Sequence, residues 1–382
     1  MPPDPMNRYE SIVRGLLERA EIAIDGPAPH DLHVHDPRFY ERVVVHGSLG
    51  LGESYMDGWW SCAQLDEFFC RVLRARLDRR VRLPWRQLLA VGLARVLNRQ
   101  SSRRAGQVAE AHYNLDTPFF EALMDARMVY SCGYWKDART LAEAQEAKLD
   151  LTCRKLSLGA GDRVLDVGCG WGSFVTFAHE RYGCSALGVT ISPSQAEYAR
   201  RRCAGRPIEI ETADYRRISR RRHGTFDKAV SLGMFEHVGP KNYRTFMRVV
   251  SDVLADDGLF LLHTIGDNYS RMRCDAWLDR YIFPNGVAPS VRQIGRAIEG
   301  IFVMEDWHNF GPDYYPTLMA WCDNLRKNYP SLALDLPVPR ERFFRMWEYF
   351  FTSFASAFKT RTLQLWQIVL SKGTVPAYAS IR

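Results

Sequence analysis

Residues 163–172 read RVLDVGCGWG, and this stretch decides the fold. Its first five residues are mostly apolar, as expected for a buried strand, and a helical stretch follows its glycines. Glycine has no Cβ and adopts backbone conformations that other residues avoid, so the run of glycines predicts a tight turn. The stretch therefore predicts a strand that passes through a glycine-rich loop into a helix.

Apolar runs alternate with helical stretches along the rest of the chain. We expect strands at residues 163–169, 185–191, 208–214, 226–234 and 258–266, with helices between the first four and a helix at 241–254 before the fifth. Continuous apolar runs separated by helices are typical of a parallel sheet that is covered on both faces. Two later runs, 301–307 and 365–373, are candidates for a pair of strands that completes the sheet. The sequence predicts an α/β, Rossmann-like fold with a seven-stranded, mostly parallel sheet.

Residues 1–105 read as a small, mostly helical accessory domain, followed by a catalytic domain at 106–382. Residues 9–24 carry apolar side chains at helical spacing. Residues 47–60, GSLGLGESYMDGWW, are interpreted as a glycine-rich loop that runs into aromatics, with Trp59 and Trp60 as candidate membrane anchors. The boundary is expected at residues 101–106.

The composition of the chain limits where the protein can be located and whether it can bind a metal. The chain is 46% hydrophobic and 25% charged, and no apolar run approaches the ~20 residues of a membrane-spanning helix. Its N-terminus lacks the basic start and apolar stretch of a secretory signal. The nine cysteines are odd in number and show no metal-ligand spacing. We expect free thiols, no metal site and a cytoplasmic protein whose membrane contact is peripheral.

The net charge of +7 is concentrated in residues 71–104, which contain eleven arginines and one acid. Leucines and valines interleave these arginines, a mixture that suits helices lying in an anionic bilayer surface. A solvated basic face and a nucleic-acid patch have the same charge pattern. Charge alone does not separate these three interpretations.

The loop after the first strand has the pattern D-x-G-x-G-x-G, formed by Asp166, Gly168, Gly170 and Gly172. A dinucleotide-binding turn would read G-x-G-x-x-G, with a pyrophosphate at the helix N-terminus. An acid that enters the loop suits a cationic ligand without a pyrophosphate, and the aminoacyl sulfonium of S-adenosylmethionine fits. The alternative is an ordinary glycine-rich turn.

The next two strand ends supply further candidates for the cofactor. Many methyltransferases end the second strand with an acid that binds the ribose hydroxyls, whereas this chain offers Thr190 and Gln195. Asp214 and Tyr215 follow the third strand and could bind the adenine amine and stack on its ring. An aspartate at a strand end is also a common helix cap.

Candidates for the reacting site follow later strands. Ligands of open α/β sheets bind beyond the carboxyl ends of the strands, where Glu236 and His263 are expected. Taken singly, each residue has an ordinary structural interpretation, and Cys132 alone would be a buried small hydrophobe. Their common position beside the cofactor loop favours a functional role.

Several segments resemble the signature segments of cyclopropane-fatty-acyl-phospholipid synthases. They occur in that family's order over about residues 110–325, and they are HYNLDTPFF, YSCGYW, VLDVGCGWGS, GVTIS, GMFEHVGPKNY, LLHTIG, YIFPNG and EDWHNFGPDYYPTLMAW. Residues 47–60 resemble the N-terminal domain of the bacterial, phospholipid-acting members. The resemblance implies a class I S-adenosylmethionine-dependent methyltransferase fold. It also implies an enzyme that converts the cis double bonds of phospholipid acyl chains into cyclopropane rings.

The resemblance also implies roles for individual residues. A bicarbonate ion would be held at the reacting centre by a set that matches Cys132, Glu236, His263, Ile265 (through its backbone) and Tyr314. Tyr130 and Ser131 match positions that contact the cofactor, as do residues 164–172, Thr190, Gln195, Asp214 and Tyr215. Phe354 stands where some members carry a cysteine, which argues against an obligatory nucleophile there. A homodimer at the inner face of an anionic phospholipid membrane is implied as well.

Three other functions remain open from the sequence. A lipid C-methyltransferase would share the first step and lose its proton elsewhere, without closing a ring. A nucleic-acid methyltransferase is suggested by the basic charge, but Cys132 lacks a Pro-Cys setting and no stacking motif is present, so we expect no nucleic acid. A non-catalytic lipid-binding protein is disfavoured by the intact acid-glycine loop.

Overall fold

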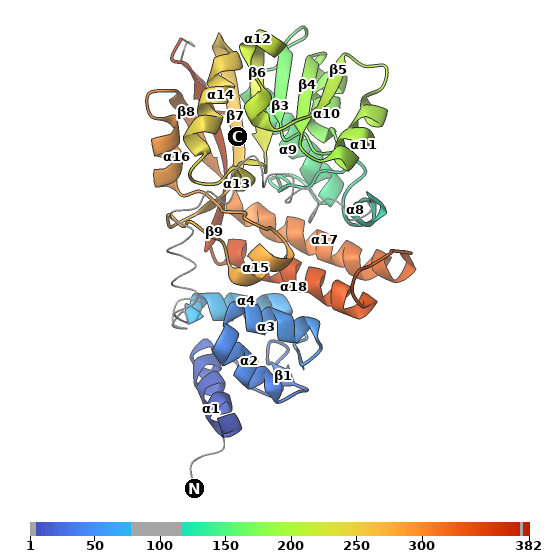
Figure 1. Cartoon of the computed structure of the whole chain (residues 1–382), viewed down its shortest axis with the longest axis vertical. Coiled ribbons are helices and arrows are strands. Elements are labelled where there is room, and N and C mark those ends of the chain that lie inside the picture. Colours follow the sequence, from blue (N-terminus) through green and yellow to red (C-terminus); the bar gives the residue numbers. More distant parts are fainter. Residues whose placement is uncertain (1–4, 78–116, 375–376) are drawn as a thin grey trace. The chain divides into compact units, whose positions relative to one another are not determined.

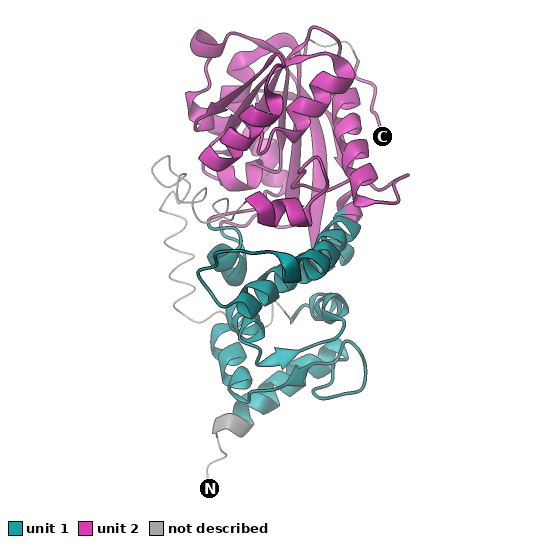
Figure 2. Cartoon of the chain, turned by 90° about the vertical axis from the view of Figure 1, so that its right-hand side faces the viewer, with its two compact units in different colours: residues 1–97, 273–284, 314–362 teal, residues 98–272, 285–313, 363–382 magenta. Residues whose placement is uncertain are grey.

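The structure is a computed structural model, and it describes residues 5–77, 117–374 and 377–382. The chain forms two compact units (Figure 2). Unit 1 comprises Met1–Leu97, Arg273–Pro284 and Tyr314–Thr362. Unit 2 comprises Asn98–Met272, Asn285–Asp313 and Leu363–Arg382.

Unit 2 is built on a seven-stranded sheet (Figure 1). Its strands are β3 (Arg163–Val167), β4 (Ser185–Thr190), β5 (Ile208–Thr212), β6 (Phe226–Leu232), β7 (Leu254–Asp267), β8 (Val303–Asn309) and β9 (Leu363–Ser371). The order across the sheet is β5-β4-β3-β6-β7-β9-β8. The first five strands are parallel, and β9 runs antiparallel to both β7 and β8. All seven predicted strands are present, and the two late ones pair with each other as expected.

Helices cover both faces of the sheet (Figure 1). Those of unit 2 are α8 (Thr117–Leu123), α9 (Leu141–Lys155), α10 (Ser173–Tyr182), α11 (Pro193–Cys203), α12 (Arg220–His223), α13 (Phe235–Val238), α14 (Tyr243–Val253) and α16 (Val291–Ile298), with 3-10 turns η2 (Tyr215–Arg217) and η3 (Gly311–Asp313). Helix α9 begins at a capping box, in which Thr140 and Glu143 satisfy backbone donors that the first turn leaves unpaired.

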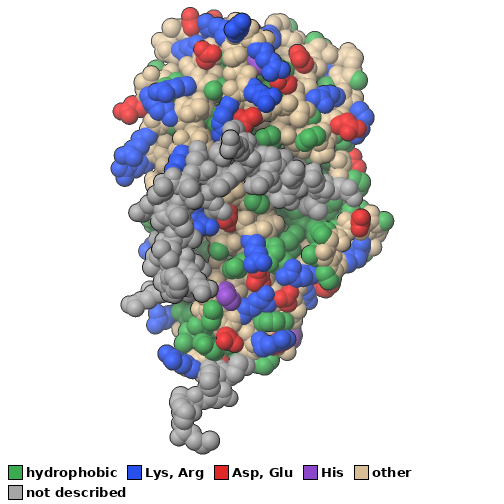
Figure 3. Space-filling view, in the orientation of Figure 1, with side chains coloured by type: hydrophobic (Ala, Val, Ile, Leu, Met, Phe, Trp, Pro, Cys, Tyr) green, Lys and Arg blue, Asp and Glu red, His purple; other side chains and the backbone are tan. Residues whose placement is uncertain are grey.

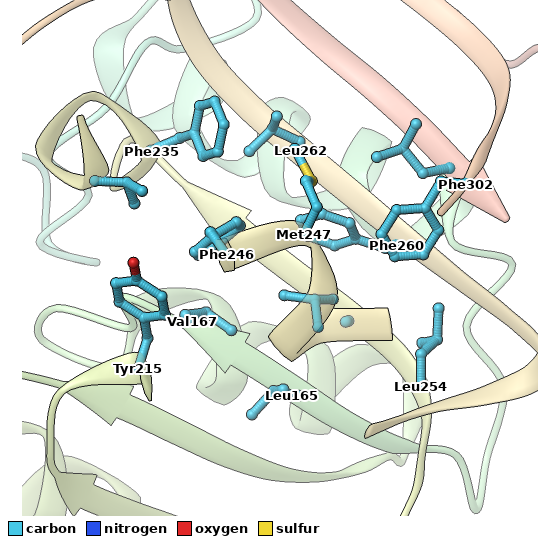
Figure 4. Close-up of a cluster of buried hydrophobic side chains, with 14 of the residues drawn as sticks. Leu165, Val167, Tyr215, Phe235, Phe246, Met247, Leu254, Phe260, Leu262 and Phe302 are labelled. Carbon is cyan, nitrogen blue, oxygen red and sulfur yellow. The ribbon is translucent and has the colours of Figure 1, made fainter. Parts of the chain in front are cut away.

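Alternate residues of each strand face opposite sides of the sheet. Leu165 and Val167 of β3 join one hydrophobic cluster with α14 and α16, part of which Figure 4 shows. Val164 joins the other cluster, with Leu149 of α9 and residues of α10 and α11. The strand residues that share the face of Val164 therefore look toward α9.

Unit 1 is mostly helical. Its elements are α1 (Pro5–Leu17), η1 (Glu18–Ala20), β1 (His33–Val34), α2 (Arg38–His46), α3 (Ser48–Met56), β2 (Trp60–Ser61), α4 (Leu65–Arg74), α15 (Ala276–Tyr281), α17 (Tyr314–Asn328), η4 (Tyr329–Ser331) and α18 (Arg340–Lys359). The late helices bind the early ones through polar contacts: the Tyr55 hydroxyl donates to Glu348 at 2.6 Å, and the Tyr315 hydroxyl donates to Asp66 at 2.8 Å.

The units therefore differ from the predicted division into residues 1–105 and 106–382, because α15, α17 and α18 group with the N-terminal helices. Their apolar and aromatic faces pack on those helices, an arrangement that hydrophobic periodicity does not reveal. The predicted boundary at 101–106 lies outside the described residues. So does most of the arginine-rich segment 71–104, from residue 78 onward.

The prediction of a glycine-rich loop at residues 47–60 was wrong, because residues Ser48–Met56 form helix α3. Two glycines of α3 allow neighbouring helices to pack closely against it. A Cβ at Gly50 would strike the carbonyl oxygen of Arg42 on α2, and a Cβ at Gly52 would strike the indole of Trp277 on α15. Trp60 was also misjudged as an anchor: it is fully buried, with its indole N–H bonded to the carbonyl oxygen of Leu51 at 3.1 Å.

The surface carries charges of both signs. On the face drawn in Figure 3, Asp and Glu side chains are interspersed among the Lys and Arg side chains. Within the described residues, no helix has the length and apolar character that crossing a membrane requires.

Gly52→Ala should lower the free energy of unfolding by about 1–3 kcal/mol, because the added methyl overpacks the contact with the buried Trp277. Gly15→Ala is the matched control: Gly15 is exposed on α1, and a Cβ there meets nothing within 4 Å. Helix propensity alone should make that change stabilising by about 0.5–1 kcal/mol. Urea unfolding followed by circular dichroism measures both. Equal effects at the two positions would show that α3 is not packed as described.

Candidate active site

A pocket opens in unit 2 at the carboxyl ends of the parallel strands, where ligands of such sheets bind. Its walls come from the ends of β3, β4 and β6, the turn after β5, helix α9 and the segment before α9. The predicted cofactor residues that line it are Tyr130, Ser131, Asp166, Gly168, Gly170, Thr190, Gln195, Asp214 and Tyr215. The structure thus brings nine predicted residues together.

The loop after β3 needs its glycines. Gly168, Gly170 and Gly172 have φ values of 98°, 54° and 79°, in the region that side chains disfavour. A Cβ at Gly168 would lie 2.6 Å from the Cβ of Met234. Gly172 does not line the pocket but is the N-cap residue of α10 and faces Ala199 of α11, so its role is to bring two helices close.

Asp166 is the acid at the entrance of this loop. Its side chain is buried, and within the described residues its Oδ1 atom has no hydrogen-bond partner. Burial raises the pKa of Asp166 to about 7, and the ammonium of Lys148 opposes the rise. A carboxylate that faces the pocket with free acceptor capacity suits a ligand that carries a positive charge.

Two side chains of α9 hold the segment that contains Tyr130 and Ser131. The Gln145 amide donates to the carbonyl oxygens of Ser131 at 2.7 Å and of Val129 at 3.4 Å. One turn later, the Lys148 ammonium donates to the Ser131 hydroxyl at 2.8 Å. Gln145 and Lys148 therefore fix both the backbone and the side chain of Ser131.

The other end of the pocket is formed after β4 and β5. The Thr190 hydroxyl donates to the side-chain oxygen of Gln195 at 3.1 Å, which fixes both polar groups. Asp214 caps the next turn and pairs with the Arg216 guanidinium at 2.7 Å. The Tyr215 ring packs edge-on against Phe246, and burial raises the pKa of its hydroxyl to about 12.

Four of the five residues predicted for the reacting site belong to unit 2, and three of them lie together. Glu236 accepts the backbone N–H of Ile265 at 2.6 Å, and His263 stands two residues before Ile265 on β7. The carbonyl oxygen of His263 accepts the N–H of Gly233 at 2.9 Å. A Cβ at Gly233 would lie 3.8 Å from that of Ser131, the neighbour of Cys132. The two predicted groups of residues are therefore adjacent.

The groups in this second cluster are buried and incompletely bonded. Within the described residues, neither ring nitrogen of His263 has a hydrogen-bond partner, and neither has the Oε2 atom of Glu236. Burial raises the pKa of Glu236 to about 7, while the Ile265 N–H opposes the rise. Burial holds the pKa of His263 well below its ordinary value, so the imidazole is neutral. Unpaired polar atoms in a buried position are costly unless a polar ligand binds them.

Tyr314, the fifth predicted residue, is the first residue of α17 and belongs to unit 1. Its ring is buried and stacks on Phe358 of α18, with the ring centroids 4.4 Å apart. The preceding residue, Asp313 of unit 2, accepts the backbone N–H of Trp135 at 2.7 Å.

Sequence reasoning missed the polar residues of α9. Gln145, Lys148, Thr152 and Lys155 recur at helical spacing and are all fully buried. Such a polar stripe ordinarily marks the solvent face of a helix, so periodicity alone would have placed it outside. The available signal was the position of the stripe immediately before the strand that carries the acid-glycine loop.

Known proteins resemble this chain along most of its length. Residues 100–368 match the family described as mycolic acid cyclopropane synthetase. A cyclopropane-fatty-acyl-phospholipid synthase from Escherichia coli (strain K12) is 48% identical over 369 residues, which cover 97% of this chain and 95% of that protein. A probable fatty acid methyltransferase from Pseudomonas putida is 33% identical over 281 residues, which cover 71% of this chain and 70% of that protein.

A solved structure agrees with the sequence comparisons. The mycolic acid cyclopropane synthase CmaA1, crystallised with SAH and CTAB, matches with a TM-score of 0.63 and 29% identity. The match covers 69% of this chain and 97% of that one. With the seven-stranded sheet described above, it confirms the predicted class I methyltransferase fold. The chain belongs to the mycolic acid cyclopropane synthetase family.

Proposed function

We propose that this protein is an S-adenosylmethionine-dependent enzyme that converts cis double bonds of phospholipid acyl chains into cyclopropane rings. The observation that carries the proposal is the likeness to the cyclopropane-fatty-acyl-phospholipid synthase of Escherichia coli, which extends over nearly the whole chain. The pocket and the adjacent polar cluster supply sites for a cationic cofactor and for a small ion.

The pocket fits S-adenosylmethionine, whose bound form supplies an electrophilic methyl group. The glycine loop allows the backbone to approach the ligand closely, and the free oxygen of Asp166 suits its amino group. Tyr130 and Ser131 would contact the amino-acid end, and Thr190 with Gln195 would hold the ribose. Asp214 and Tyr215 would hold the adenine, the former sharing its oxygens with Arg216.

The second cluster fits a bicarbonate ion. This ion carries one O–H donor and several acceptor oxygens, so it can bond to an acceptor and a donor at once. The free Oε2 atom of Glu236 would accept a hydrogen bond from this ion, and a neutral His263 would donate one to it from its ring. In this proposal Cys132 and the Ile265 backbone complete the site within unit 2, and the role of Tyr314 stays a prediction.

The chemistry requires positioning and one proton acceptor. Methyl transfer to an alkene leaves the positive charge on the acyl chain, and the ring closes when the new methyl group loses a proton. Because a carbocation is a very strong acid, a weak base is sufficient if it is held correctly. Glu236 and His263 would hold that base, and alignment can contribute ~7–11 kcal/mol to the lowering of the barrier.

The substrate requires contact with a membrane. Exposing roughly ten methylenes to water would cost about 8 kcal/mol, so the chain must pass from the bilayer into an apolar site. We propose that residues 1–105 supply a peripheral membrane-binding function and that the arginine-rich segment 71–104 binds anionic lipid. The homodimer and the cytoplasmic location stay predictions.

Incubation of the protein with unsaturated phospholipid and methyl-labelled S-adenosylmethionine should add one CH₂ to the acyl chain and remove its double bond. Mass spectrometry with ozonolysis of the product distinguishes the outcomes. The same mass gain with the double bond retained would make the protein a lipid C-methyltransferase. The similarity to the probable fatty acid methyltransferase of Pseudomonas putida is the reason to test for this outcome. No mass gain despite cofactor binding would overturn the proposal.

Glu236→Gln should lower turnover about a hundredfold, because the orientation of the proton acceptor is lost, and leave SAH affinity within about threefold. Glu299→Gln is the control, since Glu299 is exposed at the end of α16. Product formation and SAH titration measure the two effects separately. A parallel loss of SAH affinity would place Glu236 in the cofactor pocket instead.

Replacing Arg95, Arg99, Arg103 and Arg104 by Glu should weaken binding to anionic vesicles at least about tenfold, since each cation near the surface contributes ~1 kcal/mol. The matched control makes the same charge change at four exposed arginines of unit 2, Arg154, Arg221, Arg248 and Arg292. Co-sedimentation with phosphatidylglycerol vesicles measures the difference. If both variants lost vesicle affinity equally, the effect would come from net charge and not from the 71–104 segment.

A further inference from the structure

Lys148 is a fully buried lysine for which the proposed reaction has no role so far. Its ammonium donates to the Ser131 hydroxyl at 2.8 Å and lines the cofactor pocket. Among the described residues, no carboxylate oxygen lies within 4.0 Å of it. An ammonium has three donors, and burying it without an ion pair is unfavourable. Such a group requires an explanation beyond packing.

Lys155, two turns later on the same helix, shows the ordinary solution. It is equally buried, but its ammonium lies 3.6 Å from Asp306, which also pairs with Arg382. Its second contact is the ring of His308 at 3.1 Å. Lys155 therefore has a structural partner of opposite charge, whereas Lys148 faces the cofactor pocket.

The sheet places Asp166 on the side of Lys148. Val164 and Asp166 are alternate residues of β3 and share a face, and Val164 packs in the cluster that contains Leu149 of α9. Asp166 and Lys148 both line the pocket. Lys148 thus bonds one wall of the pocket, at Ser131, and lines the same pocket as the Asp166 carboxylate.

We propose that Lys148 is a positioning residue of the cofactor pocket: it fixes the Ser131 hydroxyl and keeps the Asp166 carboxylate ionised, so that a charged acceptor meets the amino group of the cofactor. This inference rests on the proposed function, because it takes S-adenosylmethionine or SAH as the ligand.

The charges around the pair support this role. Burial lowers the pKa of Lys148 to about 8, and Asp125, Cys132 and Asp166 oppose that change. Asp125 already accepts the backbone N–H groups of Arg127 and Val129. The cation at Lys148 lowers the pKa of Asp166, so removing it should favour the protonated, neutral acid. His263 and Cys169 are the other titratable groups that respond to this pair.

The test is calorimetric titration of SAH into the purified protein between pH 6 and pH 8.5. In the parent protein the affinity should fall as the pH drops through about 7, where Asp166 takes up a proton. Lys148→Met should move this midpoint upward by about one unit or more, which weakens SAH binding at least about fivefold at pH 7. Methionine is unbranched and apolar, so the buried site should accept it, and thermal unfolding checks the fold.

Three further variants separate the effect of the Lys148 charge from the effects of its hydrogen bond and of its packing. Ser131→Ala removes the hydrogen bond but keeps the cation, and its midpoint should match the parent. Lys155→Met removes the other buried lysine of α9 and should also leave the midpoint unchanged. Asp166→Asn should abolish the fall in SAH affinity as the pH drops through about 7, and adding Lys148→Met to it should not restore that fall.

The outcomes distinguish this inference from the function on which it rests. If SAH binds and Lys148→Met leaves the midpoint in place, Lys148 is only a structural residue and the inference is overturned. If Asp166→Asn keeps the parent's pH dependence, another group titrates and the inference also fails. If the folded parent protein binds no SAH at any pH, the proposed function itself is wrong.

Discussion

The burial of a polar helix face against the sheet is the constraint on which the site depends. Gln145, Lys148, Thr152 and Lys155 of α9 are removed from water, and each must recover the hydrogen bonds that it loses. Gln145 donates to the segment before α9, Thr152 accepts a hydrogen bond from Gln367 of β9, and Lys155 pairs with Asp306. Within the described residues, the side-chain oxygen of Gln145 has no such partner. The polar groups that form the pocket are therefore held by partners that cannot move independently.

The strands could be predicted because a buried parallel sheet requires apolar runs that are recognisable in the sequence. Residues 258–262, GLFLL, form a run without a polar side chain, since helices cover both faces of the sheet. The same reasoning failed at α3, where glycine composition suggested a loop. Gly50 and Gly52 have low helix propensity, but tertiary packing against Arg42 and Trp277 outweighs that preference. Contacts between distant segments are invisible to local patterns.

The site was predictable to the extent that its residues follow strand ends. Asp166, Thr190, Asp214 and Glu236 could be assigned because parallel strands deliver their carboxyl ends to one edge of the sheet. Lys148 was missed because a lysine on a helix normally reads as solvent-facing. Only the packing of α9 on the sheet reveals that Lys148 is buried and lines the same pocket as Asp166. The sequence pattern thus predicts which side chains reach the carboxyl edge of the sheet, whereas the packing of distant segments sets the environment of those side chains.

The strand order has a consequence for synthesis on the ribosome. Among the strands that the structure describes, β8 is bonded to β9 alone, although α17 and α18 separate the two strands along the chain. While β8 emerges, its pairing partner has not yet been made, so both of its edges stay unpaired until β9 follows. Non-local pairing of this kind delays folding and leaves a growing chain open to association with its neighbours. The sheet is therefore completed only when β9, the last strand in sequence, has been synthesised. Chaperones would be needed most before that point.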